Sequence, residues 1–210
     1  DIDNLKNDIL IKKSLLKEQS KKISISREKV LPNLKIEIES ILISLGMENA
    51  SFVFNLSKSL IYNKFGIDVI DVLFSANKGI DFAPLFKVVS GGELSRILLT
   101  IKSILSHHLN LPTMIFDEID TGVSGEMSNA MANLMLKMSK KMQIISITHL
   151  PQVAAKGNHH YNIYKYESLG TTNTEIKKLN NRERVEEIAK MLSGDKISSS
   201  ALNHAKQLLN

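Results

Sequence analysis

Two short apolar runs, separated by a helical segment, place the strongest limit on the fold of this chain. The runs are residues 111–116 and 144–147, and both are strings of large apolar side chains with little polar alternation. Such runs are typical of buried strands in a parallel sheet. The segment 125–142 has the length and pattern of a crossover helix, so 111–148 predicts a strand–helix–strand unit. The sequence therefore predicts an α/β fold with a mostly parallel sheet flanked by helices.

Both runs end in polar residues suited to chemistry. Asp117 and Glu118 follow the first run, and Thr148 and His149 follow the second. Ligands of open α/β sheets bind at the carboxyl ends of the strands, so we expect these side chains to share one edge. An aspartate there can hold Mg²⁺ on a nucleotide, and the next residue, a glutamate on the opposite side of the chain, can polarise an attacking water. The simpler alternatives are a solvated pair of acids and a surface or capping histidine.

A glycine turn precedes the first run. Residues 90–96 read SGGELSR, and the apolar residues that follow recur at helical spacing. The start of a helix carries unpaired N–H groups and partial positive charge, while glycines let a ligand approach the backbone closely. Ser90 adds a hydroxyl donor, and Glu93 falls in the first turn, where the helix dipole favours a carboxylate. The stretch is either a phosphate-binding turn or simply a turn before a helix.

The first part of the chain has a helical pattern of its own. Apolar residues recur at every seventh position up to Pro32, while most positions three residues later are polar. This narrow stripe predicts one long helix, followed by a second helix over 33–45 that ends at Gly46. The first helix is either a surface helix on its own domain or one arm of an antiparallel coiled coil whose partner is not in this chain. We therefore expect a helical segment, 1–45, and a folded domain, 46–210.

Shorter patterns account for other segments. Alternating apolar residues predict strands near 52–56 and 67–74, a hairpin around 169–171, and two helices that close the domain. The crossover helix carries methionines at helical spacing, which are expected to pack in the core rather than to form a binding face. They are Met127, Met131, Met135 and Met138.

Composition excludes several other classes of site. The chain has no cysteine, so disulfides, zinc–thiolate sites and cysteine nucleophiles are excluded. No apolar run approaches the roughly 18 residues that span a bilayer, and no membrane partner is expected. The net charge of +5 is compatible with nucleic acid, but many proteins that do not bind nucleic acid carry a similar charge.

In order and spacing, the motifs resemble those of ABC-type ATPases. Residues 90–93 (SGGE) resemble the signature motif, 115–118 (IFDE) the Walker B element, and 148–149 (TH) the switch-histidine loop. The longer stretches LFSANKG, VVSGGELSR, FDEIDTGVSG and ITHLPQVAA resemble the RecN family of bacterial DNA-repair proteins, which are relatives of the SMC proteins. The clear resemblance covers about 41–166. It implies the C-terminal lobe of an ABC/SMC-type P-loop ATPase head with an N-terminal coiled-coil helix.

The resemblance also implies roles for particular residues. ATP and Mg²⁺ would lie between two paired heads of a homodimer, and hydrolysis would depend on the pairing. Asp117 would support Mg²⁺, Glu118 would be the general base for water, and His149 would sense the γ-phosphate. ATP held by the opposite head would be contacted by the signature residues Ser90, Gly91, Gly92 and Glu93. Many ABC proteins place an aspartate six residues after the catalytic glutamate, where this chain has Ser124, and this departure puts the usual chemistry of that loop in doubt.

One element that such an ATPase needs is not in the sequence. None of the ten glycines fits the P-loop pattern G-x-x-x-x-G-K-[ST], which cradles nucleotide phosphates. In RecN-like proteins it lies in an N-terminal segment, so we expect this chain to be the C-terminal half of a head, inactive alone and completed by the N-terminal half of the same protein. The complete protein would hydrolyse ATP and act on DNA in double-strand-break repair and recombination, in the cytoplasm at the nucleoid. The alternatives are a head lobe of another SMC-type or ABC ATPase and a non-catalytic dimerisation module.

Overall fold

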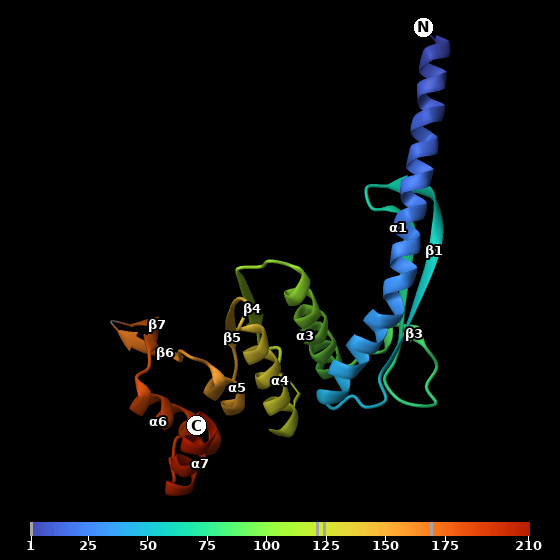
Figure 1. The fold of residues 1–210 in the computed structure, drawn as a ribbon. Helices are drawn as coiled ribbons and strands as arrows, with labels where there is room; N and C mark the ends of the chain where they lie inside the picture. Colours follow the sequence, from blue (N-terminus) through green and yellow to red (C-terminus); the bar gives the residue numbers. More distant parts are fainter. Residues whose placement is uncertain (1, 121, 124, 169) are drawn as a thin grey trace. The chain divides into compact units, whose positions relative to one another are not determined.

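The residues fold into two compact units, 1–90 and 91–210, and each unit is described by itself. The division falls within the SGGELSR stretch, between Ser90 and Gly91. The computed structural model describes residues 2–120, 122–123, 125–168 and 170–210 (Figure 1).

The first unit begins with one continuous helix, α1, from Ile2 to Ser44. The predicted break near Pro32 is wrong, because this proline lies inside the helix. An interior proline removes one backbone hydrogen bond and costs roughly 3 kcal/mol. The turns that follow it are nevertheless held by Ile38 and Leu42, whose side chains are buried. The predicted helix end is confirmed: Gly46 has a φ of 76°, the left-handed conformation that commonly terminates helices.

A long antiparallel hairpin follows α1 in the chain, and Figure 1 shows it running alongside the helix. Its strands are β1, Ser51–Asn63, and β2, Gly66–Ser75, which contain both strands predicted in this region. The two-residue strand β3, Ala83–Pro84, pairs with β2 on its other side. A short helix, α2, Leu85–Val88, ends the unit.

Polar contacts attach the hairpin to α1, and an aromatic contact joins its two strands. The hydroxyl of Ser24 and a guanidinium nitrogen of Arg27 each donate a hydrogen bond of 2.6 Å to the carboxylate of Asp68 on β2. Across the hairpin, the ring centroids of Phe52 and Phe74 lie 5.0 Å apart, and both side chains are buried. The hairpin is therefore part of the core of the first unit.

The second unit contains the predicted strand–helix–strand element. Helix α3 spans Gly91–His108 and leads to strand β4, Thr113–Asp117. Helix α4, Gly125–Met138, then crosses to strand β5, Gln143–Ile147. A short helix that the sequence did not predict, α5, follows at Pro151–Lys156.

The predicted parallel pairing is confirmed, because β4 and β5 run parallel in a continuous register. The α/β class is confirmed as well. Among the described residues the strands form small sheets, and only the β4–β5 sheet is parallel. The prediction that the α4 methionines pack in the core is also confirmed for Met131, Met135 and Met138, which are buried.

The C-terminal part of the second unit is a hairpin with two helices. The predicted hairpin is confirmed as β6, Tyr161–Ser168, paired with β7, Thr171–Lys178, although Leu169 of the predicted turn lies outside the described residues. The two predicted helices are α6, Asn181–Ser193, and α7, Ser199–Leu209. A small buried core joins α5, α6 and α7, and it consists of Ala155, Ile188, Ala189, Ala201 and Ala205. Within the described ranges, no helix is long and apolar enough to cross a membrane.

Candidate nucleotide site

The carboxyl ends of β4 and β5 bring two of the predicted motifs to one edge. The register pairs Asp117 with Ile147, and the backbone N–H of Glu118 donates to the carbonyl oxygen of Ile147 at 3.1 Å. Thr148 and His149 follow directly, so the acids and the histidine lie side by side, as predicted. Asp117, Glu118 and His149 are all exposed, and a ligand at this edge can reach each of them.

Glu118 stands in an unusual backbone conformation. Its φ of 46° is the only positive value among the described non-glycine residues. Such a conformation costs a residue with a side chain about 1–3 kcal/mol and is concentrated at functional sites. The hydrogen bond to the end of β5 helps to hold it. The turn therefore fixes the position of the glutamate immediately beyond the strand.

A third acid, Asp120, lies at this edge and was not predicted from the sequence. Its side chain is only 1% exposed, although it lies in the loop after β4. Its Oδ2 accepts a hydrogen bond from the hydroxyl of Thr148, and its Oδ1 lies 3.7 Å from Nδ1 of His149. The predicted residues are thus connected by one that was not predicted. The only signal in the sequence was a third acid within four residues, which does not distinguish a buried carboxylate from exposed ones.

The glycine turn is a helix start, as predicted, but the structure divides it between the units. Gly91, Gly92 and Glu93 form the first turn of α3, with the acid at the N-terminal end of the helix. Ser90 belongs to the first unit and is described with it. Gly91 is exposed, and a methyl group placed on it would meet no other atom within 4 Å, so its backbone is open to approach.

Side-chain contacts fix α3 against the rest of the second unit. Arg96 donates to the carbonyl oxygen of Gly92 at 3.1 Å and also lies 3.3 Å from the sulfur of Met127 on α4. The ammonium group of Lys102 lies 5.0 Å from the ring centroid of Phe116 on β4. The start of α3 and the strand that carries Asp117 are therefore held in one unit.

The loop after Glu118 comes close to the start of α3. A methyl group placed on Gly122 would lie 3.9 Å from Cα of Gly92, and the φ of Gly122 is 76°, a conformation that favours glycine. Ser124, the predicted departure from the usual loop, lies outside the described residues.

The strands of this sheet are covered on one face only. Both were predicted to be buried, and Met114 and Phe116 of β4 are. On the opposite face, the paired residues Ile115 and Ile145 are 57% and 42% exposed, and Ile147 is 45% exposed. The prediction is therefore wrong for this face, because only the side of β4 that carries Met114 and Phe116 is buried. Side chains alternate along a strand, so Asp117 lies on the open face.

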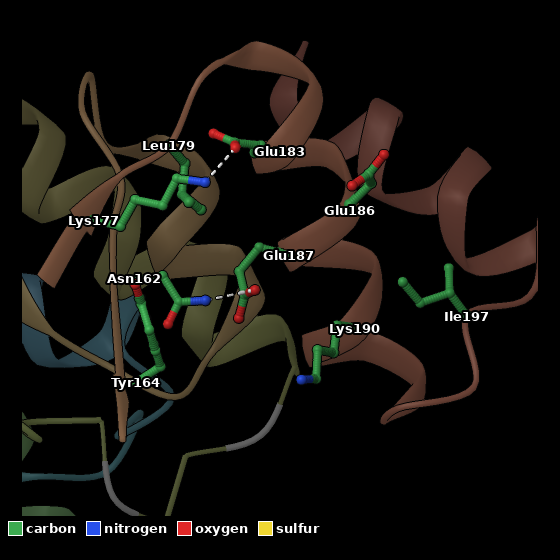
Figure 2. Close-up of a pocket in the computed structure, with 9 residues that line it drawn as sticks. All are labelled: Asn162, Tyr164, Lys177, Leu179, Glu183, Glu186, Glu187, Lys190 and Ile197. Atoms are coloured by element: carbon green, nitrogen blue, oxygen red, sulfur yellow. Dashed lines mark hydrogen bonds and ion pairs between the residues drawn. The ribbon is translucent and has the colours of Figure 1, made fainter. Parts of the chain in front are cut away.

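A separate pocket of about 310 Å³ lies between the β6–β7 hairpin and α6 (Figure 2). Its charged groups are paired within the chain: Lys177 binds Glu183 at 2.6 Å, and Asn162 donates to Glu187 at 2.8 Å. The hydrogen bond between the first two raises the pKa of Lys177 and lowers the pKa of Glu183. None of the predicted site residues is among those that line it: Asn162, Tyr164, Lys177, Leu179, Glu183, Glu186, Glu187, Lys190 and Ile197.

Sequence comparison finds similar proteins across bacteria. The chain is 38% identical to the DNA repair protein RecN of Halalkalibacterium halodurans over 199 residues, which cover 93% of the chain and 35% of that protein. It is 36% identical to RecN of Vibrio cholerae over 189 residues, which cover 90% of the chain and 34% of that protein. It is 46% identical to RecN of Bacillus subtilis over 144 residues, which cover 69% of the chain and 25% of that protein. No protein-family model matches the chain.

Comparison of folds finds the head domains of SMC proteins. The Smc head domain of Pyrococcus yayanosii with a coiled coil and joint aligns with a TM-score of 0.59 at 17% identity, over 79% of this chain and 30% of that one. A second match is the Smc head domain of Pyrococcus furiosus with an extended coiled coil, bound to the C-terminal domain of ScpA. It also aligns with a TM-score of 0.59 at 17% identity, over 88% of this chain and 43% of that one. At 17% identity, the similarity to these structures supports a shared fold and nothing further.

Proposed function

Since the chain belongs to the RecN family of DNA repair proteins, we propose that it is the C-terminal lobe of an ATPase head that acts in DNA double-strand-break repair and recombination. The chain spans about a third of the length of the curated relatives it matches. The observation that carries the proposal is the meeting of Asp117, Glu118 and His149 at one edge of a parallel sheet, in a fold like that of SMC heads. The complete protein would act on DNA in the cytoplasm, at the nucleoid.

The residues at this edge suit ATP hydrolysis. Carboxylate oxygens are preferred ligands of Mg²⁺, and the exposed carboxylate of Asp117 would hold the ion that neutralises the phosphates. Glu118, placed beyond the strand by its turn, would take the proton of the attacking water. His149 would contact the γ-phosphate from β5. Phosphoryl transfer depends mostly on positioning and charge neutralisation, and this edge would contribute the residues that position water and hold Mg²⁺.

The start of α3 would serve a second nucleotide. Gly91, Gly92 and Glu93 lie at a helix N-terminus, where backbone N–H groups and the helix dipole favour an anion. With Ser90, they would contact the γ-phosphate of ATP held by the opposite head of a homodimer. Each nucleotide would then be completed by two heads, so that hydrolysis requires pairing.

The open sheet face supports a head that is completed by another segment. Ile115, Ile145 and Ile147 expose an apolar surface on the same face as Asp117, and large apolar patches of this kind mark interaction sites. The N-terminal half of the same protein, which would carry the P-loop, is the proposed cover. The exposed apolar side chains of α1, such as Ile2 and Ile9, likewise suit a second helix of a coiled coil.

The test is Glu118→Gln in the complete protein, with Glu167→Gln, an exposed glutamate on β6, as the matched control. The amide keeps the size of the side chain but cannot accept a proton. We expect turnover of ATP to fall by about 10²–10⁴-fold, while ATP binding and head pairing remain. Unchanged turnover in Glu118→Gln would exclude Glu118 as the base.

A further inference from the structure

We propose that Asp120 is the positioning residue that joins the loop after β4 to the loop after β5 and orients His149 toward the nucleotide. The inference rests on the proposed ATPase function, because His149 is given its role there. Asp117 and Glu118 are exposed, whereas Asp120, two residues further on, is buried. A buried carboxylate is costly unless it is hydrogen-bonded, so its partners indicate what it does.

The first partner is Thr148, in the loop that carries His149. The hydroxyl of Thr148 accepts the backbone N–H of Leu150 at 2.9 Å, which leaves its single proton to be donated to Oδ2 of Asp120. Leu150 is the residue that caps the start of α5. The chain of hydrogen bonds therefore runs from Asp120 through Thr148 to Leu150. His149 lies between the two fixed residues, so its backbone is held on both sides.

The second partner is the imidazole of His149. Its Nδ1 lies 3.7 Å from Oδ1 of Asp120, and that oxygen is buried and has no hydrogen-bond partner within the described ranges. The separation is longer than a hydrogen bond, and contacts of this kind often shorten only when ligand is bound. The ring is 64% exposed, so packing leaves it room to rotate toward the carboxylate.

The geometry has a chemical consequence for the far side of the ring. When Nδ1 faces a carboxylate, the second ring nitrogen, Nε2, points away from it. In metal and catalytic sites, a carboxylate behind a histidine fixes the orientation of the ring in this manner. Asp120 would fix which nitrogen of His149 is presented at the strand edge. It would act through His149 and would not itself touch the nucleotide.

The experiment measures steady-state ATP hydrolysis by the complete protein carrying substitutions at Asp120, Thr148 and His149. We expect Asp120→Ala and Thr148→Val to lower kcat about tenfold, the size of a lost contact between coupled residues, with little change in KM. Thr148→Ser keeps the hydroxyl and is expected to restore most of the turnover lost in Thr148→Val. The matched controls are Asp195→Asn, an exposed acid after α6, and Thr113→Val, at the opposite end of β4.

The decisive measurement is the double variant Asp120→Ala with His149→Ala. If Asp120 acts through His149, turnover in the double variant equals that of His149→Ala alone. A further tenfold loss in the double variant, or equal turnover of Thr148→Val and Thr148→Ser, overturns the inference while the proposed function stands. If Glu118→Gln or His149→Ala hydrolyses ATP at the unaltered rate, the corresponding role in the proposed function fails first. Should Asp120→Ala not fold, as a melting curve would show, the two Thr148 variants decide the matter.

Discussion

The second unit contains two regions that differ in how complete they are within this chain. The C-terminal region, from α5 to α7, closes a core around Ile188 and pairs several of its charges internally, as Lys177 does with Glu183. The β4–β5 sheet is covered on one face, leaves Ile115 and Ile145 exposed on the other, and ends in exposed acids. Exposed apolar side chains also occur on the β6–β7 hairpin, at Ile163 and Ile176, but the exposed acids of the predicted site lie at the β4–β5 edge.

The difference separates structural from functional residues. Where side chains pack against or hydrogen-bond with one another within the chain, a substitution should change the stability of the fold and leave binding unaffected. Where apolar surface and carboxylates face outward, substitution should change association and catalysis more than folding. The motifs identified in the sequence all lie at or beside the incomplete region, except Ser90, which belongs to the first unit.

The largest expected effect is on activity. We expect this chain alone to hydrolyse ATP at least about a thousandfold more slowly than the complete protein, because losing even one positioned donor to a transition state costs 10²–10³-fold. The measurement is phosphate release at matched head concentration, with Glu118→Gln as the background control. The opposite result is that the chain alone hydrolyses ATP nearly as fast as the complete protein. That result would show that the β4–β5 edge needs no further segment for catalysis, and the contrast between the two regions would be wrong.

A second prediction applies the same substitution to each region. Ile188→Ala removes a fully buried side chain and should lower the free energy of unfolding of this chain by about 2–5 kcal/mol. Ile145→Ala removes a side chain that is 42% exposed and should cost this chain about 0.5 kcal/mol or less. Urea unfolding measures both.

The sharper form of that test compares this chain with the complete protein. Covering the open face would bury Ile145, so the cost of Ile145→Ala should rise in the complete protein, while the cost of Ile188→Ala should not. Equal losses at the two positions in this chain alone would contradict the contrast between the regions.

The sequence predicted those features of the structure that local residue patterns and strand topology determine. The strand–helix–strand unit and the edge with Asp117, Glu118 and His149 were predicted, because apolar runs and parallel topology determine where strand ends meet. The break at Pro32 was wrong, because burial of Ile38 and Leu42 beyond it outweighs a local propensity.

The missed features depend on contacts between distant residues. Asp120 differs from Asp117 only in its burial and in its bond to Thr148, 28 residues away, and neither can be read from hydropathy. The open sheet face was also unpredictable, because an apolar strand has the same composition whether or not its cover is part of the same chain.

A third prediction extends the contrast to the first unit, where Asp68 attaches the hairpin to α1. The hydroxyl of Ser24 and then the guanidinium of Arg27 lower the pKa of Asp68, despite its burial. Folding therefore favours the ionised carboxylate. The contribution of the ionised carboxylate to the free energy of unfolding is fully present above the unfolded-state pKa of about 3.9. It is lost as the pH falls through the lower folded-state pKa.

Asp68→Asn tests this contribution. At pH 7 we expect a loss of about 1–3 kcal/mol, because Ser24 and Arg27 lose a charged acceptor. Urea unfolding measures the free energy of unfolding of Asp68→Asn and of the unaltered chain. The difference between these two free energies should shrink below about pH 4. Asp71→Asn, an exposed acid on the same strand, is the matched control and should cost little at pH 7. A difference that stays constant down to pH 2 would contradict the assignment.

The smallest expected effect concerns the start of α6 in the complete region. The side chain of Asn180 accepts the backbone N–H of Glu183, and the Glu183 carboxylate accepts the N–H of Asn180 in return. Asn180→Ala removes half of this reciprocal cap and should cost about 1 kcal/mol, whereas Asn180→Ser, which keeps an acceptor, should cost only a few tenths. Both should leave ATP turnover of the complete protein unchanged, because Asn180 is not among the residues of the strand edge. A change in turnover without a change in stability would mean that α6 communicates with the strand edge, and the separation of the two regions would then be wrong.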